Sequence, residues 1–454
     1  MTGKTHIKIQ GKRILSELND LKRTTEAAAS ELGFTEEFTL GVIEGTKTER
    51  EIMDFIWAMG ERYPIDPYDL IIPKNDTQMG VKIMRRKESE LSKRIFNRKN
   101  KDGEKTPYYE YRDTAMSRTA PFKPEWIKEL RVVSDNNPEN PDVAYNNGHF
   151  MHQMTFFLGP ANFYYDIYGK KFCQEMNTGD SNYITPFFPH SFTSRSKDEE
   201  ALIIAVTFGG EVRRAQKEIY SLKSPLENFK FDFRNHNKAI SDLVLQHMES
   251  ERLSFNNLSS ILKENNSKIN LLKILDQNSE KSIDELKELA LYLNIGLRDL
   301  LIPGYREDED IIIKRHSKEE SFIYPNNKSP LYKINTLVRT ERLSEMKGFD
   351  IEVLTNSLKE PSSKNLHSYF YNYGNSLAGF SWWDNGGVFH DELNSGDSLY
   401  LNPRIKHAFY NKEKDNAKII ELSIPGALNL QTQIELSAFS NIERVAYETK
   451  EWFN

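Results

Sequence analysis

Two stretches of the sequence match each other without a gap and decide the fold. The first is GDSNYITPFFPHSF at residues 179–192, and the second is GDSLYLNPRIKHAF at residues 396–409. Glycine, aspartate, serine, tyrosine, proline, histidine and phenylalanine recur at the same places in both. A match of this kind indicates that one β-rich unit occurs twice in the chain.

A helical block precedes each β-rich unit. The first block ends ERYPIDPYDLIIP (residues 61–73) and the second ends LYLNIGLRDLLIP (residues 291–303), with Ile, Asp-Leu and Ile-Pro in register. Short alternating strands separated by turn signals follow between about 143 and 212, which is typical of a β-barrel. We therefore predict an α+β protein, a tandem duplication of a helix-turn-helix-like domain plus a cupin β-barrel.

The repeat sets the expected domain boundaries. We expect a helical domain at residues 1–75, a first barrel at 76–225, a second helical domain at 226–305 and a second barrel at 306–454. The start of the first barrel unit, residues 75–124, is predicted to be an irregular, basic and tyrosine-rich lead-in.

Composition excludes several classes of protein. The 454 residues carry a formal charge of -6 and a pI near 6.0, which argues against a generally cationic nucleic-acid binder. Cys173 is the single cysteine, so neither an intrachain disulfide nor a multi-thiolate metal site is possible. No apolar run of about 18 residues predicts a membrane span. Without an apolar signal core at the start, we expect a cytoplasmic protein.

The first helical block resembles the helix-turn-helix domains of small repressors. Ile14, Leu18 and Leu21 form an apolar stripe, Gly33 is placed to end a helix, and Thr35 can cap the next one. DNA binding is the functional interpretation, and a structural helical module is the alternative. The block is rich in glutamate, which would crowd a phosphate-facing surface, so we expect no nucleic-acid partner.

The stretch NNGHFMHQMTFF at residues 146–157 carries candidate metal ligands. Successive side chains of a strand point to opposite faces, so His149, Met151 and Gln153 share one face and His152 points away. His190 follows on a later strand, which is the arrangement of cupin barrels. Three ligands on one face form the facial triad of non-haem Fe(II) oxygenases.

The usual triad contains a carboxylate, and this sequence has none between Asn146 and Tyr165 or between Ser181 and Phe192. The strand phase instead offers Gln153 as the third ligand beside His149 and His190. An amide is a neutral, weaker donor, so a bound metal would keep more positive charge and attract an anionic substrate. Two alternatives remain open: Gln153 could be a polar lining residue, and His152 could be a ligand if the strand bulges.

The second barrel tests this interpretation. The alignment places Lys364 opposite His149, Ser368 opposite Gln153, His367 opposite His152 and His407 opposite His190. Under the same strand phase only His407 points inward, so we expect the second barrel to be degenerate and free of metal. Lys364 could then replace the missing cation.

These residues resemble the hydroxyethylphosphonate dioxygenase and methylphosphonate synthase family of Fe(II) cupins over nearly the full length. The resemblance rests on YYEY at residues 108–111, NNGH at 146–149, FPH at 188–190 and the repeat itself. In the dioxygenase branch the third ligand is a glutamate shortly before the last histidine, where this chain has Ile184, Thr185 and Pro186. The synthase branch uses a glutamine, so the departure favours that branch.

The resemblance implies a reaction and a site. Fe(II) would be the cofactor and O2 the co-substrate, with no external reductant. 2-Hydroxyethylphosphonate would lose its C1–C2 bond to give methylphosphonate and bicarbonate, or hydroxymethylphosphonate and formate in the dioxygenase. The phosphonate would be bound by Asn146, Tyr111, Arg98 and Lys22, and no catalytic residue is assigned beyond the metal ligands. We also expect a homo-oligomer.

Three other functions compete with this one. A transcription regulator with helix-turn-helix units and ligand-sensing cupins would require a basic recognition helix. An epoxidase of a related phosphonate would require an external reductant and normally a carboxylate ligand. A sugar-phosphate isomerase would require further acid–base residues that the sequence does not offer.

Overall fold

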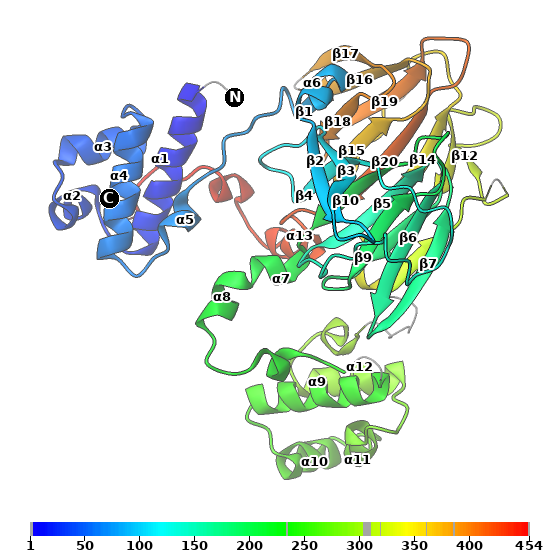
Figure 1. Cartoon of the computed structure of the whole chain (residues 1–454). Coiled ribbons are helices and arrows are strands. Elements are labelled where there is room, and N and C mark those ends of the chain that lie inside the picture. The colour runs from blue at the N-terminus through cyan, green and yellow to red at the C-terminus, as the bar shows by residue number, and fades with distance from the viewer. Residues whose placement is uncertain are drawn as a thin grey trace.

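The computed structural model describes residues 3–232, 235–302, 310–317, 319–359, 361–384 and 386–452. In Figure 1 two groups of helices lie apart from each other beside a large body of β-sheet. Helical segments and β-rich segments follow one another along the chain in the predicted order, which confirms the mixed helix and sheet class. Within the described residues, no helix is both long and apolar enough to span a bilayer.

The first helical group contains α1 (Gly3–Asp20), α2 (Thr25–Leu32), α3 (Glu36–Glu44), α4 (Glu49–Arg62) and α5 (Pro67–Leu70). Its core buries Ile14 and Leu18 of the predicted stripe. Thr35 caps α3 by accepting the Phe38 N–H, and Gly33 ends α2 with a φ of 78°. Periodicity and capping therefore place these helices as the sequence predicts. The glutamates of α3 are exposed, a surface unsuited to contact with a phosphate backbone.

The second helical group contains α9 (His236–Ser250), α10 (Phe255–Glu264), α11 (Leu271–Leu275), α12 (Ile283–Tyr292) and the 3-10 turn η2 (Leu297–Leu300). Val244, Leu258, Ile274 and Leu289 meet in its buried core. The chain reaches this group through α7 (Gly210–Arg214), α8 (Gln216–Ser221) and η1 (Leu226–Phe229).

The first β-lobe, lobe one, consists of two antiparallel sheets. One sheet has the order β11-β8-β5-β10-β4-β3-β2, and the other has the order β7-β6-β9. The strands are β2 (Arg94–Lys99), β3 (Lys105–Asp113), β4 (Phe122–Glu129), β5 (His152–Leu158), β6 (Ala161–Ile167), β7 (Lys170–Met176), β8 (Ser181–Ile184), β9 (His190–Ser194), β10 (Leu202–Phe208) and β11 (Ile311–Lys314). Side chains from both sheets, including Phe157, Phe163 and Phe192, pack into one core.

Lobe two has the same plan. Its sheets have the orders β1-β18-β15-β20-β14-β13-β12 and β17-β16-β19. The strands are β1 (Val81–Met84), β12 (Phe322–Tyr324), β13 (Tyr332–Thr336), β14 (Lys347–Val353), β15 (His367–Asn372), β16 (Ala378–Asp384), β17 (Gly387–Leu393), β18 (Ser398–Leu401), β19 (Lys406–Asn411) and β20 (Lys418–Ile424). The remaining elements are α6 (Arg86–Leu91), η4 (Glu341–Leu343), α13 (Leu430–Leu436) and η5 (Ile442–Val445).

Two features of the sheets differ from the prediction. In the described residues each lobe is a pair of open sheets, whereas the sequence predicts closed barrels. Residues 75–124, predicted to be irregular, instead contain β1, α6, β2, β3 and the start of β4. Pro124 lies within β4 opposite Val206 of β10, whereas the pairing of β4 with β3 extends only from Glu125 to Glu129. Proline has no N–H to donate to a strand ladder, and Pro124 therefore obscures the strand in the sequence.

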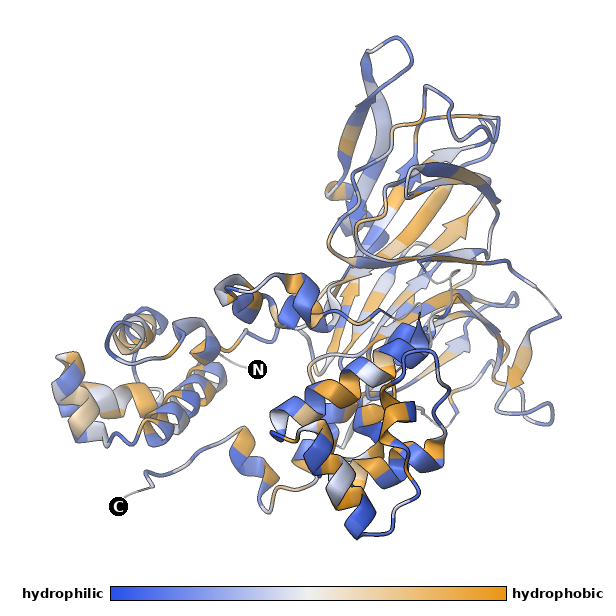
Figure 2. Ribbon diagram, turned by 90° about the horizontal axis from the view of Figure 1, so that it is seen from below, coloured by the Kyte–Doolittle hydropathy of each residue, from blue (hydrophilic) through white to orange (hydrophobic). Residues whose placement is uncertain are grey.

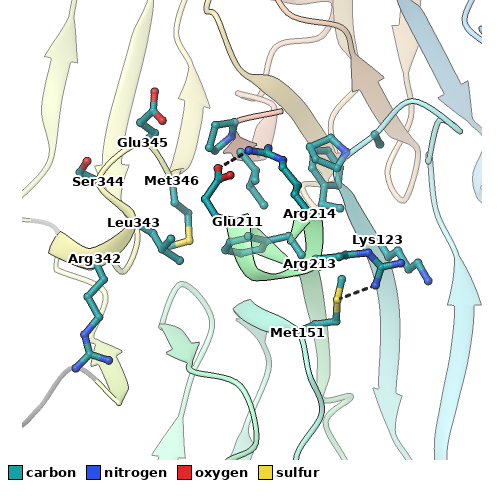
Figure 3. Close-up of a pocket in the computed structure, with 18 residues that line it drawn as sticks. Lys123, Met151, Glu211, Arg213, Arg214, Arg342, Leu343, Ser344, Glu345 and Met346 are labelled. Atoms are coloured by element: carbon teal, nitrogen blue, oxygen red, sulfur yellow. Dashed lines mark hydrogen bonds and ion pairs between the residues drawn. The ribbon is translucent and has the colours of Figure 1, made fainter. Parts of the chain in front are cut away.

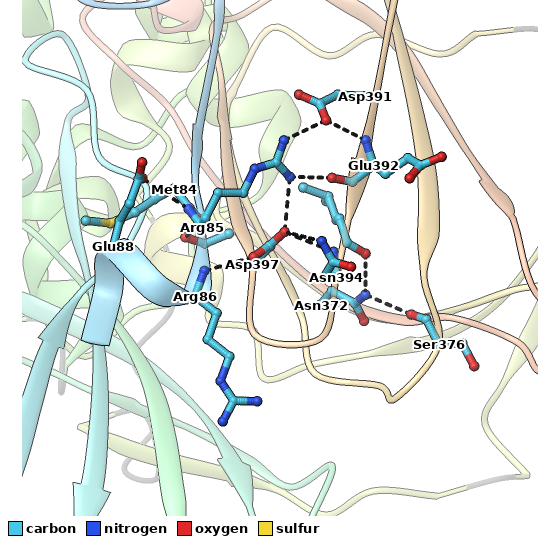
Figure 4. A network of polar contacts seen from close by, with 12 residues as sticks. Met84, Arg85, Arg86, Glu88, Asn372, Ser376, Asp391, Glu392, Asn394 and Asp397 are labelled. Carbon is cyan, nitrogen blue, oxygen red and sulfur yellow. Dashed lines mark hydrogen bonds and ion pairs between the residues drawn. The ribbon is translucent and has the colours of Figure 1, made fainter. Parts of the chain in front are cut away.

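The lobes exchange a strand. β1 precedes lobe one in the sequence but pairs with β18 of lobe two, and β11 precedes lobe two but pairs with β8 of lobe one. An ion pair follows each exchanged strand: Arg85 Nη1 lies 3.0 Å from Asp397 Oδ2, and Arg315 Nη1 lies 3.0 Å from Asp180 Oδ2 (Figure 4 shows the former). Each of these aspartates is the second residue of one of the two matching stretches, so the sequence repeat marks the points where the lobes interlock.

A shared apolar core joins the lobes. Phe156 and Val206 of lobe one pack with Tyr369 and Leu422 of lobe two, and Figure 2 shows hydrophobic residues along the strands in the middle of the β body. His152 faces this core, where its Nδ1 lies 2.8 Å from Tyr183 Oη. Burial, and then the charge of Arg342, lowers the pKa of His152 to about 4, so this imidazole is neutral at pH 7.

Candidate metal centre

A pocket of about 270 Å³ lies inside lobe one. It gathers side chains from β2, β3, β4, β5, β9, β10 and the segment before β5. The lining residues are Arg98, Tyr109, Tyr111, Lys123, Glu125, Ile127, Ala144, Asn146, His149, Met151, Gln153, His190, Phe192 and Thr207. The pocket therefore brings together every predicted site residue except Lys22. We call it the inner pocket.

Two imidazoles face each other in the inner pocket. The ring centroids of His149 and His190 lie 5.1 Å apart. His149 Nδ1 lies 2.8 Å from the Met151 carbonyl oxygen, and His190 Nδ1 lies 2.9 Å from that of Phe188. A carbonyl only accepts, so each Nδ1 carries the hydrogen and a neutral ring presents its lone pair at Nε2. Burial, and secondarily His149, lowers the pKa of His190 to about 4, which keeps its ring neutral.

Gln153 completes the arrangement. Its Oε1 lies 3.1 Å from His149 Nε2, in the orientation in which Gln153 Nε2 donates to Thr155 Oγ1 over 2.9 Å. Two lone pairs then face each other and require a proton or cation between them. Two ligands that each bind one ion at about 2.1 Å, at right angles, lie about 3 Å apart. The spacing therefore fits a metal ion.

A set of three metal ligands in the inner pocket requires the Gln153 amide beside His149 and His190. No three side chains of histidine, cysteine, aspartate or glutamate gather into a metal-binding group in the part of the chain that the structure describes. Gln153 is 5% exposed, and its partner Thr155 is fully buried. A buried polar partner of this kind orients a ligand toward its metal. The side chains also alternate as the strand spacing predicts: His149, Met151 and Gln153 line the inner pocket, and His152 does not.

Asn146 connects the two histidine segments. Its Oδ1 accepts the backbone N–H groups of Gly148 and His190, each over 2.9 Å. Its Nδ2 consequently points to His190 Nε2, at 3.0 Å. Gly148 has a φ of 72°, and an added Cβ would lie 2.4 Å from the Phe187 carbonyl carbon, so this turn requires glycine. Asn146 thus holds a donor beside His190 Nε2 while fixing the turn.

Tyr111 and Arg98 line the same pocket from neighbouring strands. Burial raises the pKa of Tyr111 above its ordinary range, so its hydroxyl remains a donor. The ring of Tyr111 packs edge-on against Phe96, at 4.8 Å between centroids. Arg98 has no carboxylate partner among the described residues, so its guanidinium is available to an anion in the pocket. The structure therefore places both predicted residues where a phosphonate could meet them.

Lys22 lies elsewhere. Its Nζ is 4.6 Å from the Trp452 ring centroid and 3.4 Å from the Asn19 carbonyl oxygen. The C-terminal segment is anchored beside it, because Thr25 N–H donates to Glu451 Oε1 over 2.7 Å. Lys22 is therefore not among the described residues that line the inner pocket.

Lys123 and Glu125 also line the inner pocket, although no sequence pattern predicted this. They alternate on β4, and the register Lys123–Thr207–Gln153 across β4, β10 and β5 places Lys123 and Gln153 on one face. Burial raises the pKa of the Glu125 carboxyl, against the opposing charges of Arg94 and Lys123. The i, i+2 spacing was the available signal, and Pro124 between them concealed it.

Lobe two has a corresponding pocket of about 280 Å³, which contains Lys364, His407 and Glu421. Lys364 forms an ion pair with Glu421, and Ser423 Oγ donates to the same carboxylate over 2.8 Å. His407 Nδ1 lies 3.1 Å from the Ile405 carbonyl oxygen, as its counterpart does in lobe one. The Lys364 ammonium thus supplies a positive charge at the position aligned with His149.

Comparisons with known proteins give concordant results, although no family model matches the chain. It is 38% identical to the methylphosphonate synthase of Nitrosopumilus maritimus over 451 residues, which cover 98% of this chain and 95% of that protein. The structure of Streptomyces albus HEPD with 2-hydroxyethylphosphonate and Fe(II) bound is similar over 99% of both chains, with 31% identity and a TM-score of 0.89. PhpD with cadmium atoms shares the fold at 17% identity and a TM-score of 0.68, covering 96% of this chain and 98% of that one.

Proposed function

The chain belongs to the methylphosphonate synthase family. From this premise we propose that it is an Fe(II)-dependent enzyme that uses O2 to cleave the C–C bond of 2-hydroxyethylphosphonate. The products are methylphosphonate and bicarbonate. HEPD, the similar structure at 31% identity, holds this substrate and Fe(II), which supports the assignment of both to this chain.

The position of Gln153 Oε1 3.1 Å from His149 Nε2 carries the proposal. His149, Gln153 and His190 would hold Fe(II), leaving the remaining positions open for substrate and O2. Bound Fe(II) would supply the activation of O2 and the chelation of the substrate. An amide in place of a carboxylate leaves the metal with one more unit of positive charge, which favours an anionic substrate. The 38% identity to a methylphosphonate synthase supports methylphosphonate as product over hydroxymethylphosphonate.

The other residues of the inner pocket would orient the substrate. Arg98 would pair with the phosphonate, because a guanidinium binds its oxygens in a bidentate manner. Tyr111 would donate its hydroxyl hydrogen to a third oxygen. Asn146 Nδ2, held beside His190 Nε2, would donate to a phosphonate oxygen next to the metal. The apolar walls formed by Ile127 and Phe192 would exclude water from the cleaved carbon atoms.

The matching sheet orders of the two lobes support a tandem duplication. We infer that each ancestral unit consisted of a helical domain and a cupin barrel, with domains at residues 1–75, 76–225, 226–305 and 306–454. The exchanged strands β1 and β11 would then have arisen after the duplication. A homo-oligomer is also proposed, and it is the arrangement in which Lys22 of a second copy could approach a phosphonate.

Phosphorus NMR tests the reaction directly. Protein loaded anaerobically with Fe(II) is mixed with 2-hydroxyethylphosphonate and O2, and the products are identified by their phosphorus and proton shifts. The expected product is methylphosphonate, with bicarbonate detected by 13C labelling at C2. Hydroxymethylphosphonate together with formate would instead show that the chain follows the dioxygenase course.

A further inference from the structure

A second cavity lies directly outside the inner pocket. It has a volume of about 540 Å³ and lies between the lobes, where α7, β4 and the 342–346 segment border it (Figure 3). Lys123 and Met151 line both this interlobe cavity and the inner pocket. These two side chains therefore form a wall that the two spaces share.

Met151 can move without disturbing the proposed metal ligands. Its backbone carbonyl holds His149 Nδ1 at 2.8 Å, which fixes the main chain. Its thioether side chain is unbranched and flexible, and such side chains readily change rotamer. Rotation of the Met151 side chain would open the shared wall and leave His149 in place.

Arg213 holds the Met151 side chain from the cavity side. Its Nη1 lies 3.6 Å from Met151 Sδ, and Figure 3 shows the guanidinium directed to Met151 beside Lys123. A Cβ at Gly209 would lie 2.3 Å from Arg213 Cδ, so the glycine leaves the space that this direction requires. A thioether is a weak acceptor, so the contact is readily exchanged for a stronger one.

The charges in the interlobe cavity distinguish Arg213 from its neighbours. Arg214 forms an ion pair with Glu211, and Arg342 Nη1 lies 3.3 Å from Asp310 Oδ1. In the described part of the chain, neither Arg213 nor Lys123 has a carboxylate within ion-pairing distance. The two cations without such a partner are thus the two that stand at the shared wall.

We propose that the interlobe cavity is the entry chamber for dianionic phosphonates and that Arg213 is the residue that opens it. This inference rests on the proposed function. A phosphonate oxygen accepts from a guanidinium far more strongly than a thioether does. An arriving dianion therefore takes Arg213 away from Met151, the side chain of Met151 turns, and Lys123 meets the anion as it enters the inner pocket.

Steady-state kinetics of Fe(II)-loaded Arg213→Gln, with Arg214→Gln as the matched control, test the entry chamber. Both variants remove one charge from the same short helix, but only Arg213 contacts Met151. Arg213→Gln is expected to raise KM for 2-hydroxyethylphosphonate about fivefold, the order expected for one charge at contact distance in water. Its kcat and iron content stay at the wild-type level. The KM of Arg214→Gln stays within about twofold, since Arg214 neither contacts Met151 nor lines the inner pocket, and the effect of its charge at a distance is screened by solvent.

A double variant gives a second, independent result. In a Met151→Ala background the wall is absent, so adding Arg213→Gln should change KM much less than it does in the wild type. Equal KM values for Arg213→Gln and Arg214→Gln, or a KM of Arg213→Gln equal to the wild type, would overturn the entry chamber alone. A wild-type protein that converts no 2-hydroxyethylphosphonate would overturn the proposed function and the chamber with it.

Discussion

Replacing Gln153 by glutamate tests the assignment of the metal ligands most directly. The substitution keeps the length of the side chain and places a carboxylate oxygen where Gln153 Oε1 lies, 3.1 Å from His149 Nε2. A metal at this point would gain a full negative charge as a ligand. Without metal the carboxylate would be buried, because the position is only 5% exposed.

The expected change in the free energy of Fe(II) binding is the difference between two opposing contributions. Two unit charges 4 Å apart interact by about 4 kcal/mol at an effective dielectric constant of 20. Burying a carboxylate costs several kcal/mol, which removes much of that gain. A net of about 1–3 kcal/mol remains, which corresponds to about fivefold to 150-fold tighter Fe(II) binding. Since the metal-free Gln153→Glu carboxyl would hold its proton, binding should also become steeper with pH.

Anaerobic titration of Fe(II) against a competing chelator measures the affinity, and phosphorus NMR identifies the product. Gln174→Glu is the matched control, because it adds the same charge on β7, outside the inner pocket, where Gln174 Oε1 accepts from Arg315. We expect Gln153→Glu to bind Fe(II) more tightly and to shift product toward hydroxymethylphosphonate, and Gln174→Glu to do neither. Equal affinities for the wild type, Gln153→Glu and Gln153→Ala would refute the assignment of Gln153 as a ligand.

Three further predictions concern the surroundings of the metal centre and the lobes. Thr155→Val removes the hydroxyl that holds the Gln153 amide, and should weaken Fe(II) binding by about tenfold in the same titration. Lys364→Met leaves the Glu421 carboxylate buried and unpaired, so urea unfolding should show a loss of about 3–5 kcal/mol, which adding Glu421→Gln largely restores. His152 and His367 have a pKa of about 4, below their ordinary 6.5, so the unfolded chain binds more protons and the free energy of unfolding should fall as pH drops from about 6.5 to 4. His152→Gln should flatten that slope in urea titrations at pH 7 and 5, and an unchanged slope would contradict the reasoning.

Local periodicity in the sequence was sufficient to predict which side chains of the 149–153 segment face the candidate site. The alternation of His149, Met151 and Gln153 separated the pocket face from His152, because side-chain direction in a strand depends only on spacing along the chain. The same alternation predicted that His367 of lobe two points away from its pocket, as His152 does in lobe one. Each of these histidines lies against a tyrosine instead: His367 Nδ1 is 2.6 Å from Tyr400 Oη, and His152 Nδ1 is 2.8 Å from Tyr183 Oη. Repeat and capping signals likewise gave the order of helical and β-rich units.

Other features required the tertiary structure, because they depend on pairing between distant segments. Strand exchange places β1 in lobe two and β11 in lobe one, and no local pattern specifies which sheet edge a short strand joins. Lys123 reaches the face of Gln153 only through β10, which lies between their strands. The contact of Arg213 with Met151 joins residues 62 positions apart. The sequence by itself thus determined the candidate ligands and the repeat, because both depend on spacing along the chain, and packing of the lobes determined the interlobe cavity beside them.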